Sequence, residues 1–257
     1  MHYFWPLEPR SDNTARTFSL NEKAWVAFIL AWVAGFSDAF GFLKLNQIFF
    51  SAVSGNTVAI NASLARRDWT EMGIRGCPII FFVVGVIFGA ILEGAASRLQ
   101  VRRRFSIALV FEVVLLLCFM LVGWVYLPSA GVPQASAPFY VLIALLSGAM
   151  GIQTASLRRV GHESVNTPFV TGMMVQALEN AVNVLFNVYD RVRSRPATFP
   201  SDSLFKALFH GGLWFCFAVG AACGGFGEVF WEFPALLVPI GVLALVIICD
   251  IVRPIYD

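Results

Sequence analysis

The stretch FSIALVFEVVLLLCFMLVGWVYL, Phe105–Leu127, carries a single charged side chain, Glu112. A helix needs about 20 apolar residues to cross the roughly 30 Å hydrocarbon core of a bilayer, so this stretch predicts a membrane-spanning helix. Five further stretches have the same length and character. They are Ala24–Leu43, Cys77–Ala96, Phe139–Leu157, Leu208–Val229 and Phe233–Ile251.

The composition of the whole chain agrees with this prediction. Of its 257 residues, 58% are hydrophobic and only 13% are charged, whereas soluble domains have about 45–50% and about 25%. This charge deficit excludes a soluble enzyme, a nucleic-acid-binding protein and a disordered scaffold, and it predicts the lipid bilayer as the main partner. The five cysteines lie in or beside apolar stretches without a CxxC motif, and the three histidines are scattered. We therefore expect no metal site and no cofactor.

Two further segments, Ile48–Ala65 and Val165–Val188, are helical in pattern but interrupted by polar residues. Counting Lys and Arg in the loops decides whether they cross, because short cytoplasmic loops are enriched in both. Six crossings place 14 Lys and Arg residues on one side of the membrane and 4 on the other, whereas eight crossings place 11 and 7. We therefore expect six crossings, cytoplasmic termini and two re-entrant polar segments, with eight crossings as the alternative. Residues 1–23 are expected to form a disordered cytoplasmic tail, and residues 24–252 a single membrane domain.

The sequence also indicates an internal repeat. Gly85, Gly89 and Glu93 have counterparts at a constant offset of 135, which are Gly220, Gly224 and Glu228. Each half, about 24–127 and 138–252, reads as helix, polar segment, helix, helix. Three crossings in each half would invert the second repeat relative to the first, an arrangement common in transporters. With eight crossings the repeats would instead be parallel.

Several motifs resemble those of a known family. AGFSDAFGF at residues 34–42 and SGNTV at 54–58 are followed in the second half by AMGIQTA at 149–155, the pair Arg158-Arg159, and FVTG at 169–172. These motifs resemble the signature of the YoaK family, small integral membrane proteins carrying a domain of unknown function. The resemblance extends over about 24–251 and implies a polytopic membrane protein of the kind described as a transporter, without a substrate or mechanism. Thr154 stands where the family pattern leads us to expect an amide side chain.

Asp38 is the sharpest candidate for function. It lies about 21 Å along its helix, at 1.5 Å per residue, where a carboxylate is costly unless it is paired, protonated or hydrated. The structural alternative is a helix cap, or a pair with Lys44 or Arg158. With Asp38, the predicted substrate pathway comprises Ser54, Asn56, Thr57, Thr171, Gln176, Asn180 and Asn183.

The last three of these residues are spaced by four and three, which places them on one helical face. That face would either line a water-filled path or lie uppermost on an interfacial helix. The four repeated glycines, Gly85, Gly89, Gly220 and Gly224, are predicted to allow close helix packing. Glu93, Glu112 and Glu228 are secondary candidates.

These features favour a small secondary transporter or channel for a small solute. Assembly of the protein into a homo-oligomer is compatible with them. The alternatives are an integral-membrane enzyme, such as a cyclase or isomerase that protonates a lipophilic substrate, and a non-catalytic membrane accessory protein. Vectorial flux of an unchanged compound would separate the first from the second.

Overall fold

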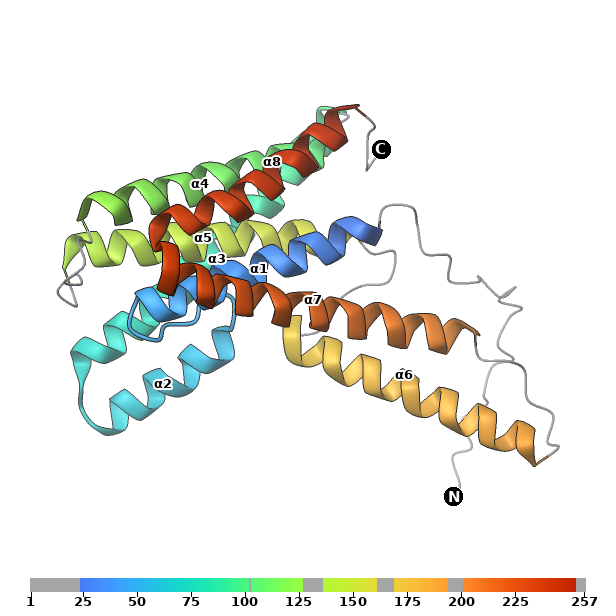
Figure 1. Cartoon of the computed structure of the whole chain (residues 1–257). Coiled ribbons are helices and arrows are strands. Elements are labelled where there is room, and N and C mark those ends of the chain that lie inside the picture. Colours follow the sequence, from blue (N-terminus) through green and yellow to red (C-terminus); the bar gives the residue numbers. More distant parts are fainter. Residues whose placement is uncertain (1–23, 102, 127–135, 161–168, 194–200, 253–257) are drawn as a thin grey trace, which may run out of the picture.

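A computed structural model describes residues 24–101, 103–126, 136–160, 169–193 and 201–252. The predicted tail, residues 1–23, lies outside this part of the chain. The described elements are helical throughout, which confirms the all-α prediction (Figure 1). In chain order they are α1 (Ala24–Lys44), α2 (Val53–Ala65), α3 (Trp69–Arg98), α4 (Arg104–Tyr126), α5 (Ala137–Val160), α6 (Phe169–Val192), α7 (Ser201–Trp231), the 3₁₀ turn η1 (Phe233–Leu236) and α8 (Leu237–Val252).

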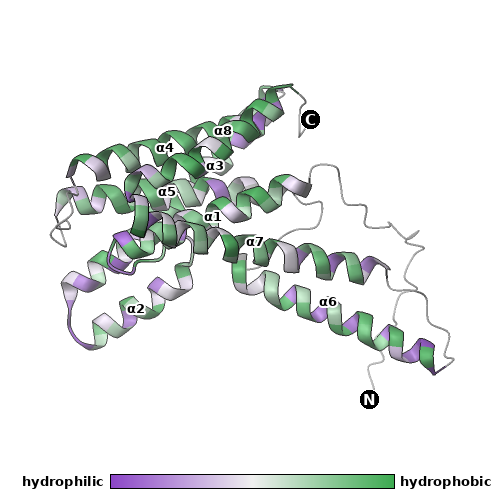
Figure 2. Ribbon diagram, in the orientation of Figure 1, coloured by the Kyte–Doolittle hydropathy of each residue, from purple (hydrophilic) through white to green (hydrophobic). Residues whose placement is uncertain are grey.

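Six helices are long and apolar enough to cross a bilayer, as predicted. They are α1, α3, α4, α5, α7, and α8 together with η1. At 1.5 Å per residue the 13 residues of α2 rise only about 20 Å, which is too short for a crossing. Helix α6 is long enough but not sufficiently apolar, and Figure 2 shows polar residues along its whole length, in contrast to α4 and α8.

Two spanning helices begin earlier than the sequence predicted. Helix α3 starts eight residues before Cys77, because the Asp68 side chain accepts a hydrogen bond from the Glu71 N–H at 3.0 Å and caps the first turn. Arg75 then pairs with Glu71 at 2.8 Å. Helix α7 likewise starts at Ser201, and its first turns carry an ion pair between Lys206 and Asp202 at 3.2 Å. These polar turns extend both helices beyond their apolar stretches.

The most extensive helix contacts join α1 to α7 and α3 to α5. A Cβ atom at Gly220 would lie 2.0 Å from the carbonyl oxygen of Trp32, and one at Gly224 would lie 2.1 Å from that of Phe36. From the first contact to the second, the residue number rises by four on α7 and by four on α1, so the two helices are parallel. Only glycine permits this approach, since any Cβ would clash with the neighbouring backbone.

The second pair is built in the same way. A Cβ at Gly85 would lie 2.3 Å from the carbonyl oxygen of Gly148, and one at Gly89 would lie 3.4 Å from the Cα of Ile152. Helices α3 and α5 are therefore also parallel. In contrast, α1 and α5 are antiparallel, because Gln153 donates to the carbonyl oxygen of Leu30 whereas Leu146 contacts Gly41.

The direction of the helices bears on α2 and α6. Helix α1 runs opposite to α3, and α5 runs opposite to α7 (Figure 1). The main contacts of α2 are with α3, and those of α6 are with α7. Figure 1 shows both helices starting near the middle of the bundle and running toward its opposite ends.

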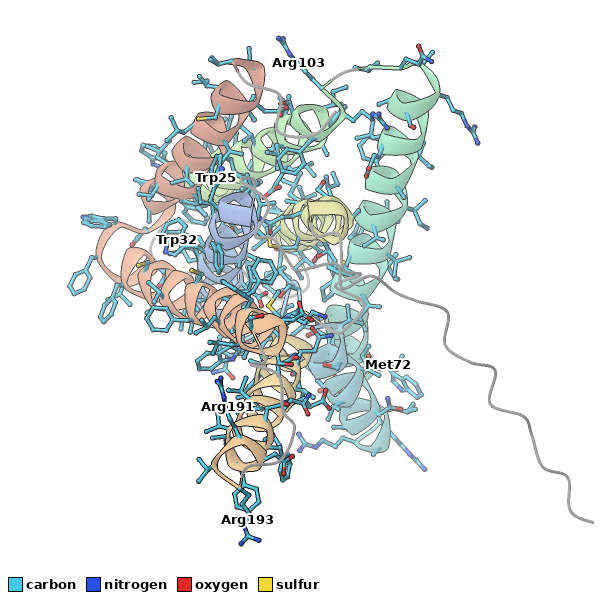
Figure 3. All side chains as sticks on the ribbon, turned by 90° about the vertical axis from the view of Figure 1, so that its right-hand side faces the viewer. Trp25, Trp32, Met72, Arg103, Arg191 and Arg193 are labelled. Carbon is cyan, nitrogen blue, oxygen red and sulfur yellow. The ribbon has the colours of Figure 1, made fainter. Side chains whose placement is uncertain are left out.

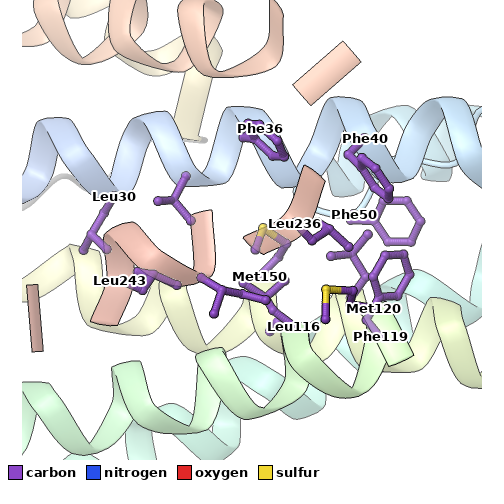
Figure 4. Close-up of a cluster of buried hydrophobic side chains, with 14 of the residues drawn as sticks. Leu30, Phe36, Phe40, Phe50, Leu116, Phe119, Met120, Met150, Leu236 and Leu243 are labelled. Carbon is purple, nitrogen blue, oxygen red and sulfur yellow. The ribbon is translucent and has the colours of Figure 1, made fainter. Parts of the chain in front are cut away.

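The hydrophobic core lies between α1, α4, α5 and α8 (Figure 4). Leu30, Leu116 and Leu243 are fully buried there. Nearer the end of the bundle where α1 finishes, the rings of Phe40, Phe119 and Phe233 meet with centroids 5.8–6.3 Å apart. Burying these side chains fixes the positions of four spanning helices from both halves of the chain.

Candidate functional site

Asp38 holds the connection between α1 and α2. Its Oδ1 accepts hydrogen bonds from the backbone N–H groups of Phe50 at 2.8 Å and Ser51 at 3.0 Å. Its Oδ2 accepts the Ser51 hydroxyl at 2.8 Å. The buried carboxylate thus receives three hydrogen bonds from the turn that precedes α2. This is a structural role, but it is not the predicted helix cap, because the N-cap position of α2 is Ala52 and the donors lie before it. Lys44 pairs with a different carboxylate, as described below, and the Arg158 side chain lies outside the described part.

Asn56 strengthens the same turn from the side of α2. Its Nδ2 donates to the carbonyl oxygen of Phe49 at 2.6 Å, and its Oδ1 accepts the Phe49 N–H at 3.3 Å. A Cβ at Gly55 would lie 2.9 Å from the Phe49 ring, which in turn lies 4.9 Å from the Phe42 ring between centroids. The SGNT motif therefore supplies a turn clamp with Asn56 and a close contact with Gly55.

The turn itself requires unusual backbone conformations. Helix α1 ends because Asn46 and Gln47 adopt positive φ angles of 54° and 57°, and the Gln47 N–H reaches back to the carbonyl oxygen of Phe42 at 2.9 Å. Such conformations cost free energy for residues other than glycine, although asparagine tolerates them best. The clamp made by Asp38 and Asn56 stabilises the returning chain, so α2 begins at Val53 rather than at the predicted Ile48.

The remaining polar residues of the two segments have different surroundings. Ser54 and Thr57 are exposed near the start of α2, and the Thr57 hydroxyl donates to the carbonyl oxygen of Val53 at 2.9 Å. Thr171 is exposed near the start of α6. These three residues present polar atoms at the ends of α2 and α6 that lie near the middle of the bundle (Figure 1).

The amides of α6 form one stripe along the helix. Asn180 donates to the Gln176 carbonyl oxygen, and Asn187 to the Asn183 carbonyl oxygen, both at 2.7 Å. Gln176 and Asn180 are half-buried and Asn183 is exposed. A second stripe is apolar and exposed, and it comprises Met174, Val175, Leu178, Val182, Leu185, Phe186 and Tyr189. Helix α6 is therefore amphipathic, and its apolar stripe suits contact with lipid.

The three predicted secondary candidates have different surroundings. Glu228 lies 3.4 Å from the Lys44 ammonium, which also approaches Glu232 at 3.8 Å and lies over the Phe233 ring. Glu93 is half-buried on α3. Glu112 is fully buried on α4, and neither of its oxygens has a hydrogen-bond partner among the residues that the structure describes.

Several polar contacts were not anticipated from the sequence. The Ser106 hydroxyl donates to the Asp250 carboxylate and joins α4 to α8. Gln153 bonds to the α1 backbone, and its neighbour Thr154 donates to the Met150 carbonyl oxygen at 2.7 Å. Ser51, the partner of Asp38, precedes the SGNT motif by three residues. Its position directly before a short polar helix was the available signal.

Basic residues mark one end of the bundle. Figure 3 looks toward the end at which α1 begins, near Trp25, and labels Arg103 between α3 and α4 as well as Arg191 and Arg193 at the end of α6. The opposite end, where α1 finishes, carries Lys44 and the three arginines Arg66, Arg67 and Arg75.

Comparison with known proteins agrees with this architecture. The family model described as "Protein of unknown function (DUF1275)" matches residues 26–249. The chain belongs to this family. It is similar to the UPF0700 transmembrane protein YoaK of Bacillus subtilis, with 26% identity over 180 residues, covering 70% of this chain and 74% of YoaK. No solved structure matches significantly. This DUF1275 protein is thus a multi-pass integral membrane protein of a YoaK-like family, as its motifs suggested.

Proposed function

We propose that this DUF1275 protein is a small secondary transporter or channel for a small solute, built as an inverted repeat with two polar helices, α2 and α6, that do not cross the membrane. One observation carries the proposal. Aligning Gly35 with Gly151 relates α1 to α5, and aligning Gly85 with Gly220 relates α3 to α7. Exchanging the halves then converts the α1–α7 contact into the α5–α3 contact, and the α2–α3 contact into the α6–α7 contact.

The correspondence extends to single atoms. A Cβ at Gly35 would lie 2.0 Å from the carbonyl oxygen of Phe217, and one at Gly151 would lie 2.3 Å from that of Phe82. Phe82 and Phe217 are 135 positions apart, the same offset as the glycines of α3 and α7. Since α1 and α5 are antiparallel, the two halves have opposite orientations. Inverted repeats with interrupted helices bind their solutes where the repeats meet.

The solute site is placed where α2 and α6 begin. The starts of these two helices carry Ser54, Thr57 and Thr171, and a helix start presents N–H groups and a positive partial charge to a ligand. Asp38 and Asn56 act as positioning residues, because their hydrogen bonds hold the turn before α2. The amide stripe of α6 would continue the path toward one surface.

The basic residues support an orientation for this transporter. Short cytoplasmic segments are enriched in Lys and Arg, and the end of the bundle near Trp25 carries Arg98, Arg103, Arg104, Arg191 and Arg193. We place this end in the cytoplasm. Helix α1 begins at this end and α8 finishes there, which corresponds to the expected cytoplasmic termini.

Uptake into vesicles tests the proposal. Purified protein is reconstituted into liposomes and incubated with a mixture of small water-soluble metabolites, and the lumen is analysed by mass spectrometry against protein-free liposomes. We expect at least one compound to accumulate unchanged. The double variant Ser54→Ala/Thr171→Val should slow this uptake, whereas Asn61→Ala, farther along α2, should leave it unchanged.

The same experiment separates the alternatives. A chemically altered compound would indicate an enzyme, and the absence of both uptake and product would favour an accessory protein. An apolar cleft of about 410 Å³ between α3, α4 and α5 is lined by residues such as Phe81, Phe88 and Phe111 and by no carboxylate, so this cleft does not supply the acid that the enzyme alternative requires.

A further inference from the structure

We infer that Glu112 binds the proton that couples transport, and that its neutral acid form is the one held inside the closed bundle. This inference rests on the proposed transport function and assigns the coupling ion. Its basis is the contrast between two buried carboxylates: Asp38 accepts three hydrogen bonds, whereas neither oxygen of Glu112 has a partner in the described part of the chain.

The position of Glu112 makes this contrast important. It lies near the middle of α4, between Leu109 and Leu116 on the buried face, and all three side chains are fully buried. Figure 4 shows Leu116 among side chains from α1, α5 and α8. An ionised carboxylate without a partner at this depth costs several kcal/mol, whereas the protonated acid costs far less.

No described basic group stands beside Glu112 to compensate a negative charge. The acidic residue on α8 is Asp250, which accepts a hydrogen bond from Ser106. Ser106 lies six residues before Glu112, which is about 9 Å along the α4 axis. On α4 itself, Arg104 donates to Ser97 of α3, and Arg103 of the preceding turn donates to the Ile251 carbonyl oxygen. The other described titratable groups on the helices that contact α4 or α5 are Asp38, Lys44, Glu71, Arg75, Cys77, Glu93, Arg98, Cys118, Tyr126, Tyr140 and Cys249.

The surroundings favour a proton over a metal cation. A cation such as Ca²⁺ or Mg²⁺ requires about six or more oxygen ligands. Apart from Glu112, the buried side-chain oxygens without a partner in the described ranges are single hydroxyls on Ser37, Ser136 and Ser147. The same ranges contain no cluster of three His, Cys, Asp or Glu side chains able to hold a metal. One proton on one carboxylate oxygen satisfies the charge without any ligand shell.

The proposed step is a reversible protonation. When Glu112 is accessible to water on one side of the membrane, its ionised carboxylate takes up one proton. It becomes a neutral acid that the closed bundle tolerates. When the site opens to the other side, the acid releases that proton. Closure without the proton would bury an uncompensated charge, and this penalty would couple movement of the solute to movement of the proton.

Two measurements test the inference. Infrared spectroscopy of the protein in nanodiscs should show the carbonyl stretch of a protonated carboxylic acid at neutral pH, lost in Glu112→Gln and retained in Glu71→Gln, a control on the outer part of α3. In proteoliposomes, Glu112→Gln should lose accumulation driven by a pH gradient while retaining solute exchange without a gradient. Gln is uncharged and similar in shape, and elution as a single species in gel filtration checks folding.

The outcomes separate this inference from the proposed function. A missing infrared band, a band removed by Na⁺ at constant pH, or gradient-driven accumulation that persists in Glu112→Gln would each overturn the inference. Accumulation that requires a Na⁺ gradient and ignores the pH gradient would also overturn it and leave the transporter proposal standing. If the wild type transports nothing, the proposed function fails together with the coupling, whereas the infrared band still decides whether Glu112 holds a proton.

Discussion

Ser51 donates to both oxygens of the Asp38 carboxylate, from its backbone N–H at 3.0 Å and from its hydroxyl at 2.8 Å. These two hydrogen bonds join the second half of α1 to the turn before α2. Together with the Asn56 clamp on Phe49, it explains how the chain reverses inside the bundle after Lys44 and starts a new helix at Val53.

The first prediction concerns this turn. Asp38→Ala removes the acceptor for three buried or half-buried donors, and each buried donor without a partner costs about 1–3 kcal/mol. We expect a lower thermal midpoint in detergent and faster proteolysis of the α1–α2 connection. Thr57→Val removes only a bond within α2 and serves as the control. Equal stability of the two variants would contradict the structural role of Asp38.

The second prediction concerns the close helix crossings. Gly35→Ala places a Cβ 2.0 Å from the Phe217 carbonyl oxygen, so α1 and α7 must separate, and overpacking of this kind costs about 1–3 kcal/mol or more. Gly73→Ala meets nothing within 4 Å and should be neutral or stabilising by up to about 1 kcal/mol. Unfolding in SDS titrations measures both. The idea fails if Gly35→Ala is as stable as Gly73→Ala.

The third prediction concerns the ion pair between α1 and α7. Lys44 and Glu228 are only 13% and 18% exposed, so replacing either one leaves a poorly solvated charge. A double-mutant cycle with Lys44→Met and Glu228→Gln should give a coupling energy of about 0.5–3 kcal/mol. Additive effects on the free energy of unfolding would show that the pair does not interact.

The fourth prediction concerns topology. Single cysteines at Lys44, Arg67 and Arg103, introduced after the five native cysteines are replaced, are labelled by a membrane-impermeant maleimide from outside intact cells. We expect α2 not to cross, so positions 44 and 67 should label alike and position 103 should not. Labelling of 44 and 103 without 67 would mean that α2 crosses the membrane and that the helix directions are wrong.

Much of this fold follows from local sequence. The six spanning helices were predicted because runs of apolar residues need no distant partner to be recognised. The starts of α3 and α7 were missed, since their first turns are polar and continue beyond the expected bilayer. The position of α2 was also inaccurate by five residues, because the turn before it depends on Asp38, which lies in another helix.

The candidate site was less predictable than the fold. The sequence indicated Asp38 as unusual, but its three hydrogen-bond donors come from a turn without a recognisable pattern. The alternative pairing of Lys44 with Asp38 was wrong, because Lys44 lies beside Glu228, 184 positions away. Glu112 was one of three secondary candidates on sequence alone, and its lack of hydrogen-bond partners in the described part of the chain emerges only when α3, α5 and α8 are assembled around α4.

The parallel pairing of α1 with α7 also governs how this protein is made. Helix α1 enters the membrane first, yet its main contact surface, including the partner of Lys44, is 184 residues away. At a synthesis rate of about 5–20 residues per second, α1 waits roughly 10–35 s for α7. During that interval the face of α1 that packs on α7, and the Lys44 ammonium, lack the contacts that α7 later supplies. We therefore expect lipid or an insertion factor to cover this face of α1 until the last quarter of the protein has been translated.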